Sequence, residues 1–183
     1  QAGLQQDAIA MAAEAMMTTD TFPKGACATI AGEGGAIHIA GIAKGSGMIA
    51  PDMATLLAFV FTDAAITPSV LQKLLSESNA KSLNSITVDS DTSTSDTCLM
   101  FASGSKALGG APLRSVDDKR LRAFRAGLHD IMQDIAVQTV SDGEGISKLM
   151  TIDVTGAEDD AAARRIGLAI GNSPLVKTAI AGE

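Results

Sequence analysis

The sequence contains neither tryptophan nor tyrosine, and phenylalanine occurs only 5 times. Aromatic side chains form the surfaces on which nucleic-acid bases and sugar rings stack, so their scarcity argues against this mode of recognition. The formal net charge is −7, and basic residues form no block along the chain. Because contacts to phosphates need clustered lysine and arginine, the charge argues against nucleic acid as a partner.

Long apolar runs are also missing, since no stretch of about 18 apolar residues occurs, as a membrane-spanning helix requires. The start of the chain lacks the basic segment of a signal peptide. The few cysteines, Cys27 and Cys98, are expected to be small buried side chains, as suits a reducing cytoplasm. The low cysteine content leads us to expect a cytoplasmic protein. The two histidines, His38 and His129, have no ligand spacing, so we expect no metal site.

The apolar residues that are present recur with helical and strand periods along the whole chain, which predicts one domain over residues 1–183. Helices are expected at 4–17, at 69–78, from 115 to just before 140, and at 159–170. Strands are expected at 25–30, 36–42, 56–63, 85–88, 98–102, 148–154 and 174–180. This mixture predicts an α+β fold with sheets layered between helices.

Two local signals support these assignments. Gly32-Glu33-Gly34-Gly35 separates two expected strands and is typical of a hairpin turn. The stretch 115–118 resembles a capping box at the start of the long helix. The apolar residues of that helix recur at helical spacing and are expected to form one buried stripe: Leu121, Phe124, Leu128, Ile131, Met132 and Ile135. His38 is expected to be a partly buried strand residue.

One candidate for covalent chemistry is Thr55, which follows Ala54 and precedes the apolar strand that begins at Leu56. If the Ala54–Thr55 bond were cleaved, Thr55 would own a free α-amine that can act as the base for its own hydroxyl. Many strands begin with threonine, however. On the pattern alone, a nucleophile and an ordinary strand-edge threonine both stay open.

Three further segments are rich in functional groups. Lys44-Gly45-Ser46-Gly47 lacks the spacing of a phosphate-binding loop. The stretch 89–97 is rich in oxygen ligands but lacks the glycine and glutamate of a calcium loop, so it is either a plain polar loop or a polar active-site rim. Asp142-Gly143-Glu144-Gly145 is either a solvated turn or a turn with a buried carboxylate that orients an amine.

Taken together, these segments resemble one family. The stretches 18–21, 44–51, 53–59 and 62–63, followed by 91–94, 96–97 and 142–145, are similar in order and spacing to ornithine acetyltransferase, the bifunctional glutamate N-acetyltransferase of arginine biosynthesis. The similarity extends over essentially all of the chain. It implies the layered α-β-β-α arrangement of N-terminal-nucleophile enzymes.

The resemblance implies that the chain cuts itself between Ala54 and Thr55. Residues 1–54 would then end an α subunit and residues 55–183 would begin a β subunit, with the subunits assembled as a heterotetramer. Thr55 would take the acetyl group of N²-acetylornithine and pass it to glutamate, without a bound cofactor, and some members also accept acetyl-CoA as co-substrate. Thr21 and Lys44 match substrate-contacting positions, and Glu144 matches an acidic residue that holds the nucleophile's amine.

The sequence also departs from the family pattern. The family's oxyanion-hole Thr-Gly pair and its C-terminal substrate-binding segment have no counterpart here, so we expect Gln1 and Glu183 to be cut points within a longer protein. Asp52, Ser90 and Ser95 replace commoner residues. Two alternatives stay open, namely a related self-processing aminopeptidase or amidohydrolase that gives the acyl group to water, and an uncleaved, non-catalytic binding or assembly fragment.

Overall fold

The computed structural model describes residues 8–50, 56–91, 95–110 and 113–182. One four-stranded sheet with the order β1-β2-β3-β4 forms its centre. The strands are β1 Lys24–Gly32, β2 Gly35–Lys44, β3 Leu57–Ala64 and β4 Thr97–Lys106. The helices are α1 Ile9–Ala15, α2 Pro68–Ala80, α3 Arg122–Val140, α4 Asp160–Gly171 and α5 Pro174–Gly182, and short 3₁₀ turns cover Leu83–Ser85 and Lys119–Leu121. The expected α+β class is confirmed.

The predicted hairpin is present. Strands β1 and β2 pair antiparallel with Gly32 opposite Gly35, and the turn between them holds Glu33 and Gly34. Gly35 has a φ of +109°, a backbone conformation that a side chain would strain. The glycines of this turn therefore fix the register of the first two strands.

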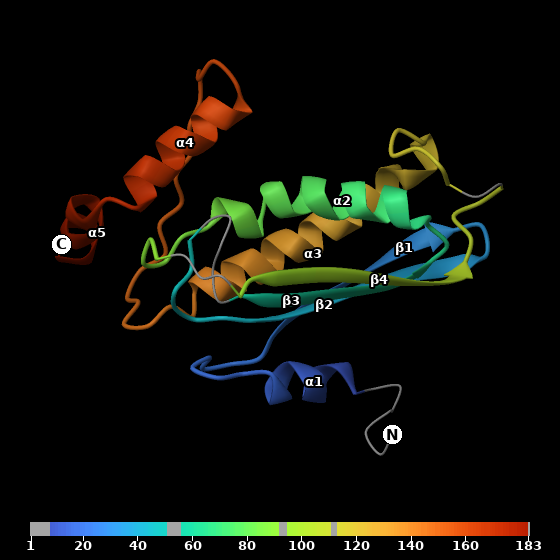
Figure 1. Ribbon diagram of the computed structural model, residues 1–183, viewed down its shortest axis with the longest axis horizontal. Coiled ribbons are helices and arrows are strands. Elements are labelled where there is room, and N and C mark those ends of the chain that lie inside the picture. The colour runs from blue at the N-terminus through green and yellow to red at the C-terminus, as the bar shows by residue number, and fades with distance from the viewer. Residues whose placement is uncertain (1–7, 51–55, 92–94, 111–112, 183) are drawn as a thin grey trace.

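Strand β3 lies inside the sheet, antiparallel to β2 and parallel to β4. Helix α2 makes the crossover between β3 and β4, as a parallel pair requires. Helices α2 and α3 cover one face of the sheet, whereas α1 lies on the opposite side (Figure 1). Helices α4 and α5 extend from one end of this body (Figure 1).

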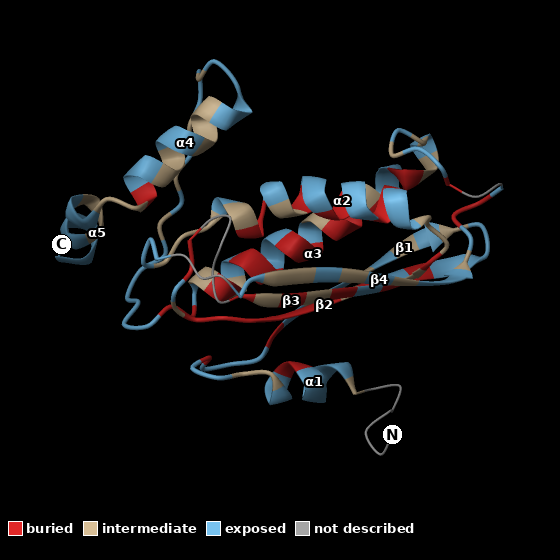
Figure 2. Cartoon of the chain, in the orientation of Figure 1, coloured by how far each residue is buried: buried red, intermediate tan, exposed pale blue. Residues whose placement is uncertain are grey.

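The core lies between helices α2 and α3 and the sheet, where buried residues gather on the facing sides (Figure 2). The predicted stripe of the long helix is confirmed, since every member is at most 2% exposed: Leu121, Phe124, Leu128, Ile131, Met132 and Ile135. Gly41 of β2 lets α3 approach closely, because a Cβ there would lie 2.6 Å from Ile135 Cδ1.

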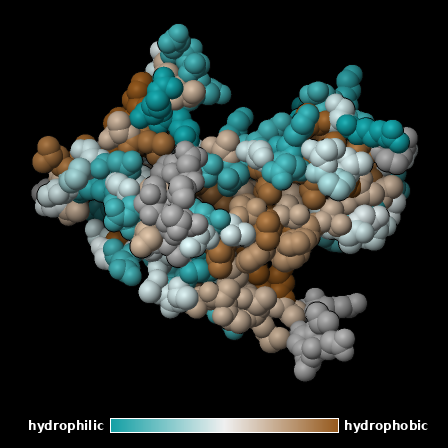
Figure 3. All heavy atoms as spheres, in the orientation of Figure 1, coloured by the Kyte–Doolittle hydropathy of each residue, from teal (hydrophilic) through white to brown (hydrophobic). Residues whose placement is uncertain are grey.

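The other face of the sheet is apolar yet largely exposed. Cys27, Ala40, Phe61 and Phe101 lie opposite one another in a row across the four strands, and the two phenylalanine rings stack at 5.5 Å. Phe61 and Phe101 are 39% and 50% exposed. Hydrophobic atoms are visible at the surface between the sheet and α1 (Figure 3). The described residues thus contain a single sheet, with helices α2 and α3 on one face.

Two expectations about burial are wrong for the same reason. Cys27 is exposed rather than buried, and His38 is exposed rather than partly buried. Both alternate with residues that pack under α3, so both lie on the uncovered face. Cys98 alternates with Leu99 and lies toward the core side, where burial raises the pKa of its thiol to about 11.

Two predicted strands are not strands in the described part of the chain. Residues 85–88 begin with the last residue of a 3₁₀ turn, and among the described residues they make one ladder-like contact, from Val88 N–H to the Ile49 carbonyl at 2.8 Å. Residues 148–154 show the alternating exposure of a strand, and Ile152 and Val154 pack against α4. A strand needs a neighbouring backbone as well as an alternating pattern, and the described residues provide none beside 148–154.

The expected strand at 174–180 is also wrong, because these residues form helix α5. Pro174 occupies the first helical position and the Ser173 hydroxyl accepts from Val176 N–H at 3.4 Å, an ordinary helix start that outweighs the apolar, β-branched content. The long helix also starts later than predicted. Asp118, not Ser115, caps the 3₁₀ turn that precedes α3, through a bond from Arg120 N–H at 3.0 Å.

Candidate active site

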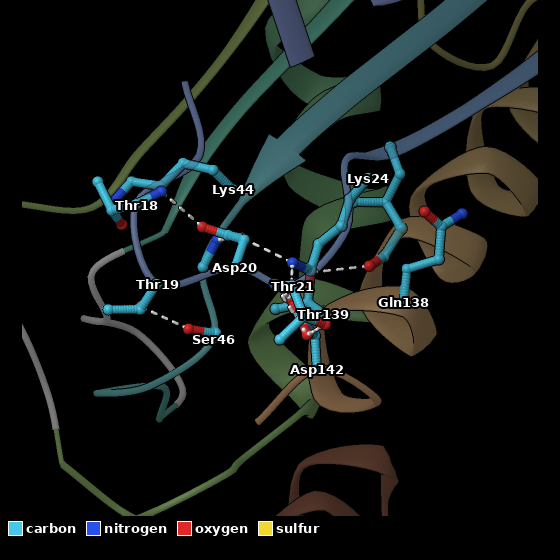
Figure 4. A network of polar contacts seen from close by, with 12 residues as sticks. Thr18, Thr19, Asp20, Thr21, Lys24, Lys44, Ser46, Gln138, Thr139 and Asp142 are labelled. Atoms are coloured by element: carbon cyan, nitrogen blue, oxygen red, sulfur yellow. Dashed lines mark hydrogen bonds and ion pairs between the residues drawn. The ribbon is translucent and has the colours of Figure 1, made fainter. Parts of the chain in front are cut away.

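Three loops meet at one end of the sheet: the turn 18–21 before β1, the loop 44–47 after β2, and the turn 142–144 after α3 (Figure 4). Lys24 at the start of β1 pairs with Ala43 near the end of β2, so the turn and the loop leave the hairpin side by side. Helix α3 packs along β1 and ends at Val140, which brings the third segment to the same place. The fold thus gathers segments that are up to 121 residues apart.

Lys44, a predicted substrate-binding residue, is the last residue of β2 and pairs with Leu57, the first residue of β3. Lys44 is only 8% exposed, and its Nζ donates to Thr18 Oγ1 at 3.3 Å. Within the described ranges, no carboxylate lies within 4.0 Å of this ammonium. The charge of Lys44 acts on Asp96, whose pKa burial raises while the hydrogen bond from Leu56 N–H and the charge of Lys44 oppose the rise.

Thr21, the second predicted substrate-binding residue, is held by Asp142. The Asp142 carboxylate accepts from Thr21 N–H at 3.0 and 3.2 Å, and it also accepts from the Thr21 hydroxyl. Thr21 itself is exposed, whereas Asp142 is 5% exposed. The turn before β1 is therefore fastened to the end of α3, with the Thr21 side chain at the surface of the site.

Asp142 belongs to a buried ion triad. Lys24 Nζ lies 2.5 Å from Asp142 Oδ2 and 2.6 Å from Asp20 Oδ1, and the three side chains are at most 2% exposed. Burial raises the pKa of both carboxyls, but the hydrogen bonds from Lys24 and from backbone or threonine donors outweigh it, so both pKa values lie below the ordinary value of 3.8. The Phe22 ring lies 4.9 Å from Lys24 Nζ and covers it.

Glu144, the predicted partner of the nucleophile's amine, lies beside the 44–47 loop. Its N–H donates to the Ser46 carbonyl at 3.1 Å. Its carboxylate faces Gly47, because a Cβ at Gly47 would lie 3.9 Å from Glu144 Cδ. Glu144 is exposed, in contrast to Asp142 two residues earlier. The acidic turn 142–145 thus contains both kinds of carboxylate that the sequence allowed, namely a buried one in Asp142 and a solvent-exposed one in Glu144.

The predicted nucleophile Thr55 and the predicted cleavage residue Ala54 lie outside the described residues, as does Asp52. The residue after Thr55 is fixed on both sides: Leu56 N–H donates to Asp96 Oδ1 at 2.9 Å, and the Leu56 carbonyl accepts from Thr97 N–H at 3.0 Å.

Asp89, in the polar stretch 89–97, holds the backbone that follows the 44–47 loop. The Asp89 carboxylate accepts from Met48 N–H at 2.5 Å and from Ile49 N–H at 3.0 Å. Met48 adopts a φ of +55°, which is uncommon for a residue with a side chain. Asp89 and Asp96 thus both hold backbone that flanks 51–55. That the stretch forms an active-site rim stays a prediction.

A separate cleft of about 560 Å³ lies between residues 85–88, the segment 144–154, and helices α4 and α5. Of the predicted site residues it includes Glu144 but neither Thr21 nor Lys44. We therefore place the candidate site at the three loops rather than in this cleft. The described residues contain no group of three histidine, cysteine or acidic side chains suited to bind a metal ion.

Sequence reasoning missed Asp20 and Lys24 as parts of this site. Nothing in the pattern marks Lys24 as buried, because a lysine at the start of a strand is normally solvated. The one sequence signal for this ion cluster is the acidic turn 142–145, because one of its two interpretations is a buried carboxylate that faces an amine. The amine turns out to be that of Lys24, and the carboxylate that of Asp142.

Comparison with known proteins gives a consistent result over the whole chain. A profile of the ArgJ family matches residues 1–183. The arginine biosynthesis bifunctional protein ArgJ of Agrobacterium fabrum is 57% identical over 173 residues, which cover 94% of this chain and 42% of the relative. The protein of the same name from Rhizobium meliloti is 56% identical over 185 residues, covering 100% of this chain and 44% of the relative. The chain thus spans less than half the length of these relatives.

Two solved structures are more distant. The PH0078 protein of Pyrococcus horikoshii is 10% identical with a TM-score of 0.43, covering 66% of this chain and 39% of its own. An L-aminopeptidase D-Ala-esterase/amidase of Ochrobactrum anthropi is 14% identical with a TM-score of 0.40, covering 70% and 43%. No conclusion rests on either likeness. The family match and the identities above 50% establish that this chain belongs to the ArgJ family.

Proposed function

We propose that this chain is the central part of a self-cleaving acetyltransferase that moves an acetyl group from N²-acetylornithine to glutamate. Family membership supports the reaction class, since the relatives are named for a bifunctional role in arginine biosynthesis. The observation that carries the proposal is the environment of Lys44, a buried ammonium at the end of β2. Lys44 pairs with Leu57 at the start of β3, the strand that Thr55 precedes.

A buried ammonium is costly unless an opposite charge compensates it. Lys24 meets two carboxylates, whereas Lys44 meets only the Thr18 hydroxyl among the described residues, with Asp96 farther away. An α-carboxylate of a substrate would supply the missing charge. Donor and acceptor both carry that group, so one lysine serves both halves of the reaction.

In the proposed mechanism, Thr55 Oγ first attacks the carbonyl carbon of Ala54, and the peptide bond breaks to leave an ester and the free Thr55 α-amine. Water then hydrolyses the ester, which releases the Ala54 carboxylate and the Thr55 hydroxyl. This step divides the chain into residues 1–54 and 55–183. The amine next takes the hydroxyl proton while Oγ attacks the acetyl carbon of N²-acetylornithine, and ornithine leaves with that proton. Glu144 holds the amine in place. The amine of glutamate then attacks acetyl-Thr55 and restores the free hydroxyl.

Several further properties belong to the same proposal. The α and β subunits assemble as a heterotetramer, acetyl-CoA serves as a second donor, no cofactor stays bound, and the enzyme works in the cytoplasm. None of the helices in the described ranges combines the length and apolarity needed to cross a bilayer.

The test is an acetyl-transfer assay on the full-length protein, with N²-acetylornithine or acetyl-CoA as donor and glutamate as acceptor, combined with intact mass measurement. We expect the wild type to split between residues 54 and 55, and Thr55→Ala to abolish both splitting and transfer. Lys44→Met should raise KM for both amino acids by about tenfold or more, whereas Lys106→Met, at the far end of the sheet, should leave KM unchanged.

Three results would contradict the proposal. Release of free acetate without N-acetylglutamate would indicate the hydrolase class instead. An unsplit protein without transfer would indicate a non-catalytic fragment. Full transfer by Thr55→Ala would place the nucleophile elsewhere.

A further inference from the structure

The buried triad Asp20–Lys24–Asp142 has no part in the chemistry described above, although it contacts Thr21 and the loop that follows Lys44 (Figure 4). Removing three charges from water is expensive, and such clusters contribute little net stability compared with apolar packing. A cluster of this kind at the centre of a site therefore calls for an explanation beyond stability. The explanation lies in the other hydrogen bonds that each carboxylate accepts.

Asp142 fixes the direction of the hydrogen bond that the Thr21 hydroxyl donates. An ionised carboxylate only accepts hydrogen bonds, and the threonine hydroxyl has a single hydrogen to donate. Because the Thr21 hydroxyl donates to Asp142 Oδ1, its oxygen has only lone pairs left for any other partner. Lys24 keeps Asp142 in the charged form through its 2.5 Å contact with Oδ2. Thr21 Oγ1 can thus receive a hydrogen bond from a ligand but cannot give one.

Asp20 fixes the loop that carries Lys44. Asp20 Oδ1 accepts from Gly45 N–H at 2.7 Å, and Oδ2 accepts from Thr18 N–H at 3.1 Å. Gly45 has a φ of +153°, so a side chain there would strain the loop. Asp20 thus holds the backbone next to Lys44 and the backbone of Thr18, the residue whose hydroxyl accepts from Lys44 Nζ.

We propose that Asp20, Lys24 and Asp142 are positioning residues that set Thr21 as a hydrogen-bond acceptor and Lys44 as a cation within one rigid substrate site. The inference rests on the proposed function and specifies its ligand class. An N-acyl α-amino acid carries an N–H and a carboxylate on the same carbon, so a site that holds an acceptor and a cation offers a partner to each substituent. A free α-ammonium, as in glutamate, also donates to an acceptor.

The test compares two acetyl donors with the full-length protein and glutamate as acceptor. One donor is N²-acetylornithine. The other is 2-acetoxy-5-aminopentanoate, in which oxygen replaces the amide N–H. The measured quantity is the ratio of kcat/KM for the amide to kcat/KM for the ester, so the intrinsic reactivity of the ester cancels between variants. A change in general stability would not alter this ratio.

Thr21→Val removes the acceptor, and we expect the ratio to fall about tenfold, with the loss confined to the amide. Thr21→Ser keeps the hydroxyl and should keep the ratio. Thr29→Val is the matched control, because Thr29 is an exposed hydroxyl on β1, bonded to His38 and remote from the site.

Asp142→Asn should lower the ratio as Thr21→Val does, because an amide at this position can donate to Thr21 Oγ1 and occupy its lone pair. The double variant should show no further fall, since both changes act through one hydroxyl. Thr21→Val leaves the triad intact and therefore still tests the acceptor role if Asp142→Asn does not fold.

Each outcome has a defined meaning. A wild-type protein that transfers no acetyl group overturns the proposed function and this inference with it. Transfer by Thr21→Val with an unchanged ratio overturns this inference alone. A folded Asp142→Asn variant with the wild-type ratio removes Asp142 from the positioning role.

Discussion

At the scale of single residues, two carboxylates of one short turn have opposite environments. Asp142 is buried and ion-paired, whereas Glu144 is exposed beside the 44–47 loop. The charge of Asp142 is compensated by Lys24 and Thr21, so Asp142 is suited to fix the loop that it contacts. The exposed carboxylate of Glu144 remains accessible to a ligand or an amine. In the proposed mechanism, Asp142 would position Thr21 and Glu144 would hold the amine of the nucleophile.

The triad predicts how stability depends on pH. The pKa values of Asp20 and Asp142 are lower in the folded chain than their ordinary value of 3.8. Their charged forms therefore stabilise the fold above that pH, and this contribution is lost as pH falls through the folded values. We expect the free energy of unfolding, measured with urea, to decline below about pH 4.

Asp142→Asn should lower the free energy of unfolding at pH 7 by about 3 kcal/mol, because it leaves Lys24 buried with one carboxylate. It should also weaken the decline in acid. Asp130→Asn, on the exposed side of α3, is the control and should follow the wild-type curve. Parallel acid curves for wild type and Asp142→Asn would show that Asp142 does not contribute.

At the scale of elements, α3 is the main packing partner of the sheet. It lies against β1 and β2, and its buried stripe faces the small residues Ala28 and Gly41 of those strands. The end of the helix delivers Asp142 and Glu144 to the site. A change that loosens α3 should therefore affect stability and substrate binding together.

Leu128→Ala tests this packing role. Leu128 is fully buried, so its truncation leaves a cavity and should lower the free energy of unfolding by about 2–5 kcal/mol. Val137, on the same helix, is 41% exposed, and Val137→Ala should cost less than about 1 kcal/mol. Urea midpoints of the two variants give the comparison. Similar losses in both would mean that α3 does not pack as described.

At the scale of the whole molecule, one sheet face is covered by α2 and α3 while the other exposes a row from Cys27 to Phe101. Exposed apolar patches of this kind usually mark a contact surface. The α-β-β-α arrangement expected from the resemblance would place a second sheet against this face in a protein of the relatives' length.

Cysteine labelling measures this coverage. In the 183-residue chain at pH 7.5, a maleimide should react rapidly with the exposed Cys27 and slowly with Cys98, because burial raises the pKa of Cys98 to about 11. In the full-length protein, Cys27 should become protected until urea is added. Cys27→Ser is the control for assignment. Equal rates for Cys27 in both proteins would count against a second sheet on this face.

The sequence by itself determined the elements whose signals are local. The glycines of 32–35 set the hairpin, the spacing of apolar residues set the buried stripe of α3, and the resemblance indicated Thr21, Lys44 and Glu144. These features depend on backbone conformation and on which side chains share a face, and both are written in short windows of sequence.

Only the tertiary structure decided what depends on partners far along the chain. The alternating pattern of 148–154 predicts a strand, but pairing needs a neighbouring backbone that no local window specifies. Asp20, Lys24 and Asp142 are ordinary surface residue types, and they are buried only because β1, β2 and the end of α3 meet there. The reason is physical: the stability of a buried charge depends on its neighbours in space, and those neighbours lie up to 121 residues away in sequence.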